Sequence, residues 1–255
     1  MAPFKTQHAN NTNSIPPSKM HSNARTGSSI IQWNIRGLKR NLLECQNLLR
    51  KYSPLAICLQ ETKLNCQENL NHVGNYRLHR EDLISNTIAH GGVAIAILAG
   101  IPHYRLPLNT PLQAIAIKLE LPKFQLTLCS LYLNPNEPIS NAELSALVNQ
   151  LSHPYMLLGD FNSHHTVWGS KQSDPRGNGI LKFMQFENLC LMNSGKQTYH
   201  NLAHNSLSAI DLSLCTPGLL SQFNWDTHLF TLSSDHFPIV IRFNDSPKLS
   251  VRPPS

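Results

Sequence analysis

The chain has 255 residues, of which 41% are hydrophobic, and this is enough for one large domain with a substantial core. Of its formal net charge of +6, residues 1–29 contribute +3 and residues 245–255 contribute +1, so residues 30–244 carry only +2. This mild charge permits a polyanionic partner without requiring one. The apolar runs are far shorter than the ~18 residues of a membrane span, and the first residues lack the apolar stretch of a secretory signal, so we expect neither.

The six cysteines occur singly, with no Cys-x-x-Cys pair and no cysteine–histidine cluster at zinc-ligand spacing. Most of them lie in apolar runs, as Cys58 does in LAICLQ and Cys129 does in LTLCSLYL. We therefore expect buried thiols of an intracellular protein.

The first half of the chain predicts several strands and one helix. The segment SIIQWNI is a short apolar strand that ends at Asn34, and a turn leads from it into a helix that stops before Pro54. The segment LAICLQE predicts a strand that is buried on both faces and ends at Gln60-Glu61. Three apolar runs follow without a helical pattern between them, which predicts antiparallel pairing. The apolar face of the helix consists of Leu38, Leu42, Cys45 and Leu49, and the three runs are GGVAIAIL, LQAIAIKLEL and FQLTLCSLYL.

The second half predicts two further helices among strands. Ser140 and Glu143 have the spacing of a capping box, and the helix that they begin stops before Pro154. Asn178 is a candidate cap for a later helix with apolar positions on one face. Strands are expected in YMLLGDFN, LCLMNSG, LSAIDLSLC and HFPIVIRF.

Strands mixed with three helices predict an α/β protein with two stacked mixed β-sheets flanked by helices, a four-layer α/β sandwich. We expect this single domain to occupy residues 29–244. Residues 1–28 and 245–255 are polar and proline-rich, which is typical of a disordered amino-terminal arm and a flexible tail or linker.

Polar side chains occur where apolar strands are predicted to end. Each has an ordinary explanation when it is taken singly, since an asparagine or aspartate often caps a helix or forms an Asx-turn, and a histidine is more often structural than catalytic. Their repetition instead favours one shared site. The residues are Asn34, Glu61, Tyr132, Asp160, Asn162, Asp211, Asp235 and His236.

The chemistry of these side chains points to a metal-assisted hydrolysis. Four carboxylates brought together would repel one another unless a divalent cation neutralised some of them, and oxygen ligands without sulfur suit Mg²⁺ or Mn²⁺. Two asparagines can hold a ligand or orient a water without adding charge. An imidazole such as that of His236, next to a carboxylate, can stabilise a phosphoryl group in the transition state. Hydrolytic attack on a phosphodiester needs these groups.

Six ordered motifs resemble those of the endonuclease/exonuclease/phosphatase superfamily: QWNIRG, ICLQETK, SLYLNPN, GDFNSHHTVWG, SAIDLSL and LSSDHFPI. The match spans about residues 30–244 and implies a DNase I-like fold. The segments HHTVWG, DPRGNGILKFM and LMNSGKQTY are more narrowly similar to the apurinic-endonuclease-like domain of non-LTR retrotransposon pol proteins, particularly the arthropod types related to Jockey, I and R1 elements.

The resemblance implies a role for each residue of the set. Glu61 matches the principal metal-binding glutamate, and Asn34 matches an amide beside it that binds the metal or the phosphate. Asp235 is expected to lie next to the metal. The others match catalytic residues: Asp160 activates the attacking water, Asn162 positions it, Tyr132 contacts the phosphate, and Asp211 hydrogen-bonds His236. Which carboxylate acts as the base stays open.

The function that the resemblance implies is a divalent-metal-dependent DNA endonuclease of a non-LTR retrotransposon. It would nick double-stranded DNA in the nucleus and leave a 3′-hydroxyl that primes reverse transcription. Element RNA and reverse transcriptase would be partners through a parent polyprotein, and no membrane is expected. The chain would then be an excised domain or a truncated copy, with a genuine amino end. Three alternatives stay open: a cellular abasic-site repair endonuclease, a phosphatase or sphingomyelinase of the same superfamily, and an inactive DNA-binding module.

Several other residues in or near the motifs have less specific predicted roles. Arg36, Lys63 and Lys171 are candidates for contacts with DNA phosphates, although isolated basic residues usually belong to the solvated surface. His164 and His165 favour loop hydrogen bonds over metal ligation. Trp168 is expected to be a packing anchor.

Overall fold

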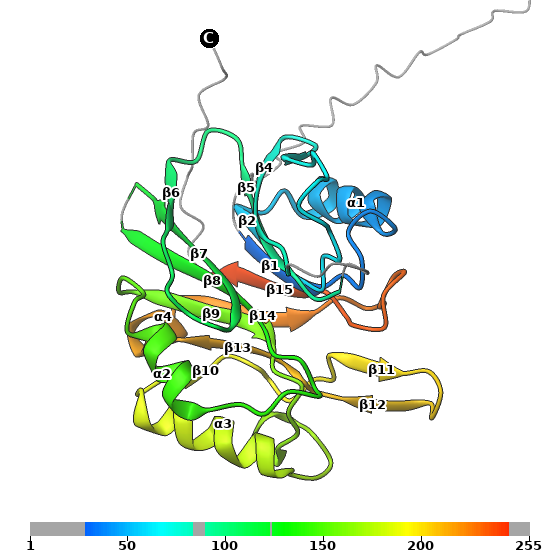
Figure 1. The fold of residues 1–255 in the computed structure, drawn as a ribbon, viewed down its shortest axis with the longest axis vertical. Coiled ribbons are helices and arrows are strands. Elements are labelled where there is room, and N and C mark those ends of the chain that lie inside the picture. The colour runs from blue at the N-terminus through cyan, green and yellow to red at the C-terminus, as the bar shows by residue number, and fades with distance from the viewer. Residues whose placement is uncertain (1–28, 84–89, 123, 245–255) are drawn as a thin grey trace, which may run out of the picture.

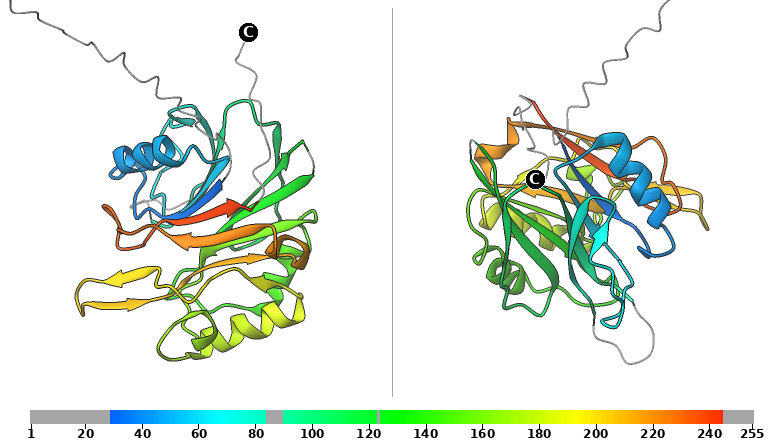
Figure 2. Two further views of the ribbon diagram at one scale, coloured as in Figure 1. Left: turned by 180° about the vertical axis from the view of Figure 1, so that it is seen from behind. Right: turned by 90° about the horizontal axis from the view of Figure 1, so that it is seen from above.

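Two β-sheets stack face to face, and helices cover their outer faces (Figures 1 and 2). This computed structural model describes residues 29–83, 90–122 and 124–244. The expected arm at 1–28 and the expected tail at 245–255 lie outside the described residues.

The three predicted helices are present and form the outer layers. Helix α1 (Leu42–Tyr52) packs on the first sheet, whereas α2 (Asn141–Val148) and α3 (Pro175–Phe186) pack on the second. These layers confirm the predicted α/β sandwich. A short helix, α4 (Pro217–Leu220), lies near the edge of the second sheet. Among the described residues, no helix is long and apolar enough to cross a membrane.

The first sheet has the strand order β14-β15-β1-β2-β5-β4-β3. Strands β1 and β2 are parallel, with Asn34 beside Gln60, and the other neighbours are antiparallel. Its strands are β1 (Ser29–Asn34), β2 (Ala56–Gln60), β3 (His72–Val73), β4 (Tyr76–Glu81), β5 (Val93–Leu98), β14 (Phe223–Thr227) and β15 (Ile239–Phe243).

The second sheet has the strand order β10-β13-β9-β8-β7-β6. Here β8 and β9 are the parallel pair, and α2 connects them. Its strands are β6 (His103–Leu106), β7 (Gln113–Glu120), β8 (Gln125–Tyr132), β9 (Tyr155–Asp160), β10 (Cys190–Leu191) and β13 (Asp211–Cys215).

The three consecutive apolar runs do not all pair with one another. Strands β7 and β8 are antiparallel neighbours, as predicted, but β5 lies in the other sheet between β2 and β4. Strand β4 was not predicted, because its sequence YRLHRE carries charges. Only Tyr76 and Leu78 of β4 are buried, so one face of the strand contacts the core and the other stays polar.

Helix starts differ from the predictions at two places. Leu38 is buried but lies in the turn before α1, which begins at Leu42. The cap of α3 is Asp174, whose carboxylate accepts a hydrogen bond from the Gly177 N–H at 2.5 Å, whereas Asn178 lies inside the helix. Pro175 at the first helical position favours the earlier start, because a proline there loses no helical hydrogen bond.

Two fully buried glutamines join the sheets inside an otherwise apolar interface. Gln32 of β1 donates to the carbonyls of Gly159 and Leu212 and accepts from the Ser213 hydroxyl. Gln60 of β2 donates to the Ser130 hydroxyl of β8 at 2.9 Å. Because these partners belong to the opposite sheet, the amides favour one relative placement of the two sheets.

A two-stranded hairpin, β11 (Tyr199–Asn201) and β12 (Ser206–Ser208), projects from the body of the sandwich (Figure 2). It stands apart from both sheets, and Leu202 at its turn is 70% exposed. The loop between β14 and β15 projects on the same side in all three views (Figures 1 and 2).

Candidate active site

The predicted polar residues converge because of how the strands run. Parallel strands β1 and β2 end side by side, as do β8 and β9, where Tyr132 faces Asp160. Strand β13 is antiparallel to β9, so its first residue, Asp211, lies opposite Asp160 at the end of β9. Strand β15 is antiparallel to β1 in the same way. Asp211 thus begins a strand and the Asp235-His236 pair precedes one, which corrects the expectation that they close strands.

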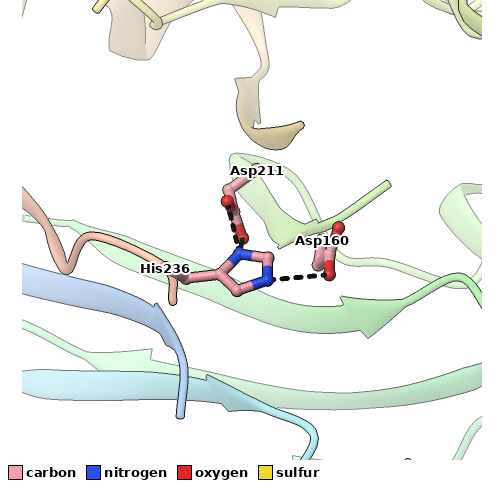
Figure 3. Close-up of side chains that lie close together, drawn as sticks. All are labelled: Asp160, Asp211 and His236. Carbon is pink, nitrogen blue, oxygen red and sulfur yellow. Dashed lines mark hydrogen bonds and ion pairs between the residues drawn. The ribbon is translucent and has the colours of Figure 1, made fainter. Parts of the chain in front are cut away.

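His236 lies between two buried aspartates (Figure 3). Its Nδ1 is 2.8 Å and 3.1 Å from the two carboxylate oxygens of Asp211, and its Nε2 is 3.9 Å from Asp160 Oδ2. Candidate ligand atoms of these three residues lie within 4.8 Å of one another. The imidazole therefore has one nitrogen held by Asp211 and the other directed toward Asp160.

The surrounding charges change how this group titrates. Burial alone would lower the pKa of His236, but Asp211, Asp160 and Asp235 together raise it to about 9. Burial and the neighbouring Asp211 raise the pKa of Asp160 to about 7, although His236 acts in the opposite direction. An imidazolium at neutral pH can donate from both nitrogens, whereas Asp160 is poised to take up a proton.

Asn34 connects the two sheets within the site. Its amide nitrogen donates to Glu61 Oε1 at 3.0 Å and to Asp160 Oδ2 at 2.9 Å. Its amide oxygen accepts from the Arg36 N–H at 3.1 Å. Asn34 therefore holds two carboxylates from different sheets close together without adding charge.

Tyr132 and Asn162 complete the surroundings of these acids. Burial, followed by the negative charges of Glu61 and Asp160, raises the pKa of the Tyr132 hydroxyl, which is hydrogen-bonded to Glu61. The Asn162 N–H donates to Asp160 Oδ1 at 3.0 Å, and the Asn162 amide donates to the Leu133 carbonyl. The Asn162 backbone thus orients Asp160, while its side-chain nitrogen is bound to the neighbouring loop.

Two basic residues pair with the carboxylates that were predicted to bind metal. Lys63 Nζ lies 2.7 Å from Glu61 Oε2, and Arg36 Nη1 lies 2.5 Å from Asp235 Oδ2. Burial alone would raise the pKa of Glu61, but hydrogen bonds from Asn34 and Lys63 and the positive charge of Lys63 bring it below the usual value. Glu61 is therefore kept ionised by its neighbours.

The loops that carry these residues adopt a left-handed backbone conformation. Arg36, Glu61, Lys63 and Asn162 have φ angles of 51°, 49°, 50° and 46°, and all four lie within three residues after the end of β1, β2 or β9. This region is unfavourable for residues other than glycine and asparagine. Such conformations concentrate at functional sites, where the surrounding contacts maintain them.

Three residues that the motifs did not single out help to position His236. Trp33 Nε1 donates to the His236 carbonyl at 3.0 Å, and the Ser234 hydroxyl accepts from the His236 N–H while donating to the Asn34 carbonyl. The Tyr199 ring packs against the imidazole at a centroid distance of 4.8 Å. Trp33 and Ser234 directly precede predicted site residues, which is a usable sequence signal, but nothing in the sequence connects Tyr199 with His236.

The other residues that the sequence singled out near the motifs lie in different surroundings. Trp168 is fully buried, which confirms a packing anchor, and its ring nitrogen donates to the Ser163 carbonyl. His165 accepts a hydrogen bond from the Val167 N–H, as expected of a loop histidine. Lys171 lines a groove of about 500 Å³ whose lining also includes Tyr199.

The donor set fits a divalent cation. Glu61 and Asp235 supply carboxylate oxygens, the donors that hard cations prefer, and Asn34 lies next to Glu61. Asp235 Oδ1 is buried and has no hydrogen-bond partner among the described residues. A buried carboxylate oxygen without a partner is costly, and a bound cation would satisfy it.

Comparisons with known proteins agree with this geometry. A family model described as Endonuclease-reverse transcriptase matches residues 126–240, a range that includes Asp160, Asp211 and His236. This part of the chain thus resembles the endonuclease/exonuclease/phosphatase superfamily, as its motifs predicted.

Two similar proteins come from transposons. It is 23% identical to the probable RNA-directed DNA polymerase from transposon BS of Drosophila melanogaster, over 86% of this chain and 25% of that protein. It is 26% identical to the corresponding protein from transposon X-element of the same organism, over 83% of this chain and 24% of that protein. The chain thus spans about a quarter of the length of these relatives.

Solved structures show the same fold. The endonuclease domain of TRAS1, a telomere-specific non-LTR retrotransposon, superposes with a TM-score of 0.72 at 19% identity, over 85% of this chain and 98% of that domain. The AP endonuclease LMAP from Leishmania major superposes with a TM-score of 0.69 at 16% identity, over 85% of this chain and 87% of that chain. The DNase I-like sandwich and the resemblance to retrotransposon endonuclease domains are thereby confirmed.

Proposed function

We propose that this protein is a divalent-metal-dependent DNA endonuclease of a non-LTR retrotransposon. It nicks target DNA in the nucleus and leaves a 3′-hydroxyl that primes reverse transcription. The observation that carries the proposal is the buried contact between Asn34, Asp160 and His236, which brings residues from both sheets together with Glu61 and Asp235 beside them. The transposon relatives support the retrotransposon context.

The chain supplies the base of the hydrolysis. Asp160, with its pKa raised to about 7, accepts a proton from the water that attacks phosphorus. Asn34 and the Asn162 N–H hold this carboxylate in one orientation. As the water oxygen bonds to phosphorus, the bond from phosphorus to the 3′-oxygen breaks, and the departing oxygen takes up a proton from solvent to become the 3′-hydroxyl.

His236 and Tyr132 stabilise the phosphoryl oxygens. The imidazolium, held through Nδ1 by Asp211, presents its Nε2–H to a negative oxygen in the transition state. The Tyr132 hydroxyl contacts the same phosphate. Mg²⁺, or Mn²⁺ in its place, held by Glu61 and Asp235 with Asn34 beside them, would supply positive charge against the phosphate.

Nicking of supercoiled plasmid tests this function. We expect the protein to convert plasmid to the open circle with Mg²⁺ and to stop when the metal is chelated. Asp160→Asn and His236→Asn should each slow nicking by at least about 10²-fold, because each removes a proton-transfer or charge-stabilising group. Asp226→Asn is the matched control, since Asp226 is a half-exposed acid paired with Lys196. Parent-like cutting by both site variants would refute the assignment.

The chemical group at the 3′ end of the nick shows whether the nick can prime DNA synthesis. A polymerase should extend the nicked strand without prior phosphatase treatment, because a 3′-hydroxyl is already present. Extension only after removal of a 3′-phosphate would contradict the proposed polarity of cleavage. A reverse transcriptase and element RNA would then use the nick as part of a longer parent protein.

The alternatives predict different substrates. A cellular abasic-site repair endonuclease would spare intact plasmid and rapidly cut DNA that contains abasic lesions. A phosphatase or sphingomyelinase would release phosphate or phosphocholine from small substrates and leave plasmid intact. An inactive DNA-binding module would bind DNA without turnover with any metal supplied.

A further inference from the structure

The Arg36 guanidinium pairs with Asp235, a carboxylate that the proposed function assigns to the metal site. Its Nη1 lies 2.5 Å from Asp235 Oδ2, and the two side chains are 54% and 12% exposed. Asp235 Oδ1, the other carboxylate oxygen, lies 4.0 Å from His236 Nε2. The protein without metal therefore neutralises the shielded Asp235 with a cation of its own.

The backbone keeps Arg36 at this place. Its φ angle of 51° is left-handed, and its N–H donates to Asn34 Oδ1 at 3.1 Å. The next N–H, that of Gly37, donates to the Glu61 carbonyl at 2.8 Å. The start of the loop is thus tied to β1 and to the residue after β2, so a guanidinium that leaves Asp235 stays at the rim of the candidate site.

A divalent cation on Asp235 must compete with this guanidinium for the same carboxylate. Two cations close to one carboxylate repel each other, so binding of one weakens binding of the other. We infer that Arg36 is a built-in counter-ion of Asp235, which lowers the metal affinity of the free protein and is released when the metal binds. The inference rests on the proposed function, because it assumes that Asp235 contributes to the metal site. A released guanidinium at the rim is then available to a DNA phosphate.

Direct binding of Mn²⁺ in the absence of DNA tests the competition. Arg36→Asn removes the charge and keeps a residue that tolerates a left-handed backbone. We expect it to bind Mn²⁺ about tenfold more tightly than the parent, the size expected when one charge is removed a few ångströms from a partly shielded site. Titration calorimetry and electron paramagnetic resonance of free Mn²⁺ give the affinities.

Two matched variants separate competition from a general change of charge. Arg36→Lys keeps the positive charge and should bind Mn²⁺ nearly as the parent does. Lys39→Gln removes an equal charge from the same loop, but Lys39 pairs with Glu68 at 2.9 Å, so its Mn²⁺ affinity should also be unchanged. A tenfold gain in Lys39→Gln would overturn the inference, because it would show an effect of net charge alone.

The outcomes distinguish this inference from the proposed function. Equal or weaker Mn²⁺ binding by Arg36→Asn overturns the inference, while metal-dependent nicking by the parent would leave the proposed function standing. Absence of Mn²⁺ binding in the parent and all variants, together with metal-independent nicking, overturns both. If Arg36→Asn fails to fold, the ¹⁵N resonance of the Arg36 side chain in the parent decides. We expect it to shift when Mg²⁺ is added, and a constant resonance overturns the inference.

Discussion

At the scale of single residues, Asp211 determines what His236 can do. The carboxylate binds His236 Nδ1 at 2.8 Å, and its charge is the largest of the effects that raise the pKa of the imidazole to about 9. The contact fixes the orientation of the ring and leaves Nε2 free to face a phosphate oxygen. Asp211 therefore acts through His236.

Asp211→Asn should separate orientation from charge. The amide can keep a hydrogen bond to the ring, but it no longer favours the imidazolium, so the pKa of His236 should fall. Because the active form is protonated, the alkaline limb of the pH–rate profile for nicking should move to lower pH. The rate at neutral pH should drop by about 10²-fold. An alkaline limb at its original pH would contradict the proposed role, and Asp226→Asn again serves as the control.

At the scale of elements, the start of α3 is packed against the loop that leaves the site. The Asp174 N–H donates to the His164 carbonyl, and Asp174 caps the helix through the Gly177 N–H. A Cβ atom at Gly177 would overlap the His164 carbonyl oxygen. A glycine inside a helix is unfavourable by itself, and here close packing on a loop two residues beyond Asn162 explains it.

Two glycines of α3 should respond oppositely to alanine. Gly177→Ala should lower the free energy of unfolding by about 1–3 kcal/mol, because the helix must move away from a backbone atom. Gly179→Ala meets its nearest neighbour, Asn141 Oδ1, at 3.7 Å and should raise stability by about 0.5–1 kcal/mol through better helix propensity. Urea unfolding of both variants measures the difference. Equal effects of the same sign would contradict the packing argument.

At the scale of the whole molecule, polar contacts align the two sheets at different places. Gln32 and Gln60 join them inside the core, and a histidine pair joins them between β4 and β6. His103 Nδ1 donates to the Ile101 carbonyl at 2.7 Å, so its Nε2 accepts from His79 Nε2 at 2.9 Å. In this arrangement the Nε2 of His103 carries no proton.

The histidine pair should make stability depend on pH. Burial, followed by the charges of His103, Arg77 and Arg105, lowers the pKa of His79 to about 4, whereas an unfolded histidine titrates near ~6.5. Between these values the unfolded chain binds more protons than the folded chain. The contribution of His79 is therefore complete above about pH 6.5 and is lost as pH falls toward 4.

Comparison with His79→Gln isolates this effect from the other titrating groups. The stability difference between parent and variant, measured by urea unfolding, should change in favour of the variant as pH falls from 7 to 4. A difference that stays constant over this range would show that His79 titrates in the folded protein as it does when unfolded.

Much of the site could be predicted because its members lie next to strong strand signals. Asn34, Glu61 and Asp160 each end or follow an apolar run, and their convergence agrees with the prediction. The partners of Gln32 lie more than a hundred residues away along the chain, and no local pattern marks that contact. The pairing of Arg36 with Asp235 could not be predicted from the sequence either, since the two residues are 199 positions apart.

The amino-acid sequence by itself determined which segments become buried strands and helices, because hydrophobic periodicity is local, and it revealed the resemblance to the superfamily, because the motifs are short and ordered. The tertiary structure alone decided that β5 joins the first sheet while β7 and β8 pair in the second, and that charged β4 becomes a strand. The physical reason is that backbone hydrogen bonds can join two strands whatever their side chains are. The partner of each strand therefore depends on which arrangement buries all the apolar faces together.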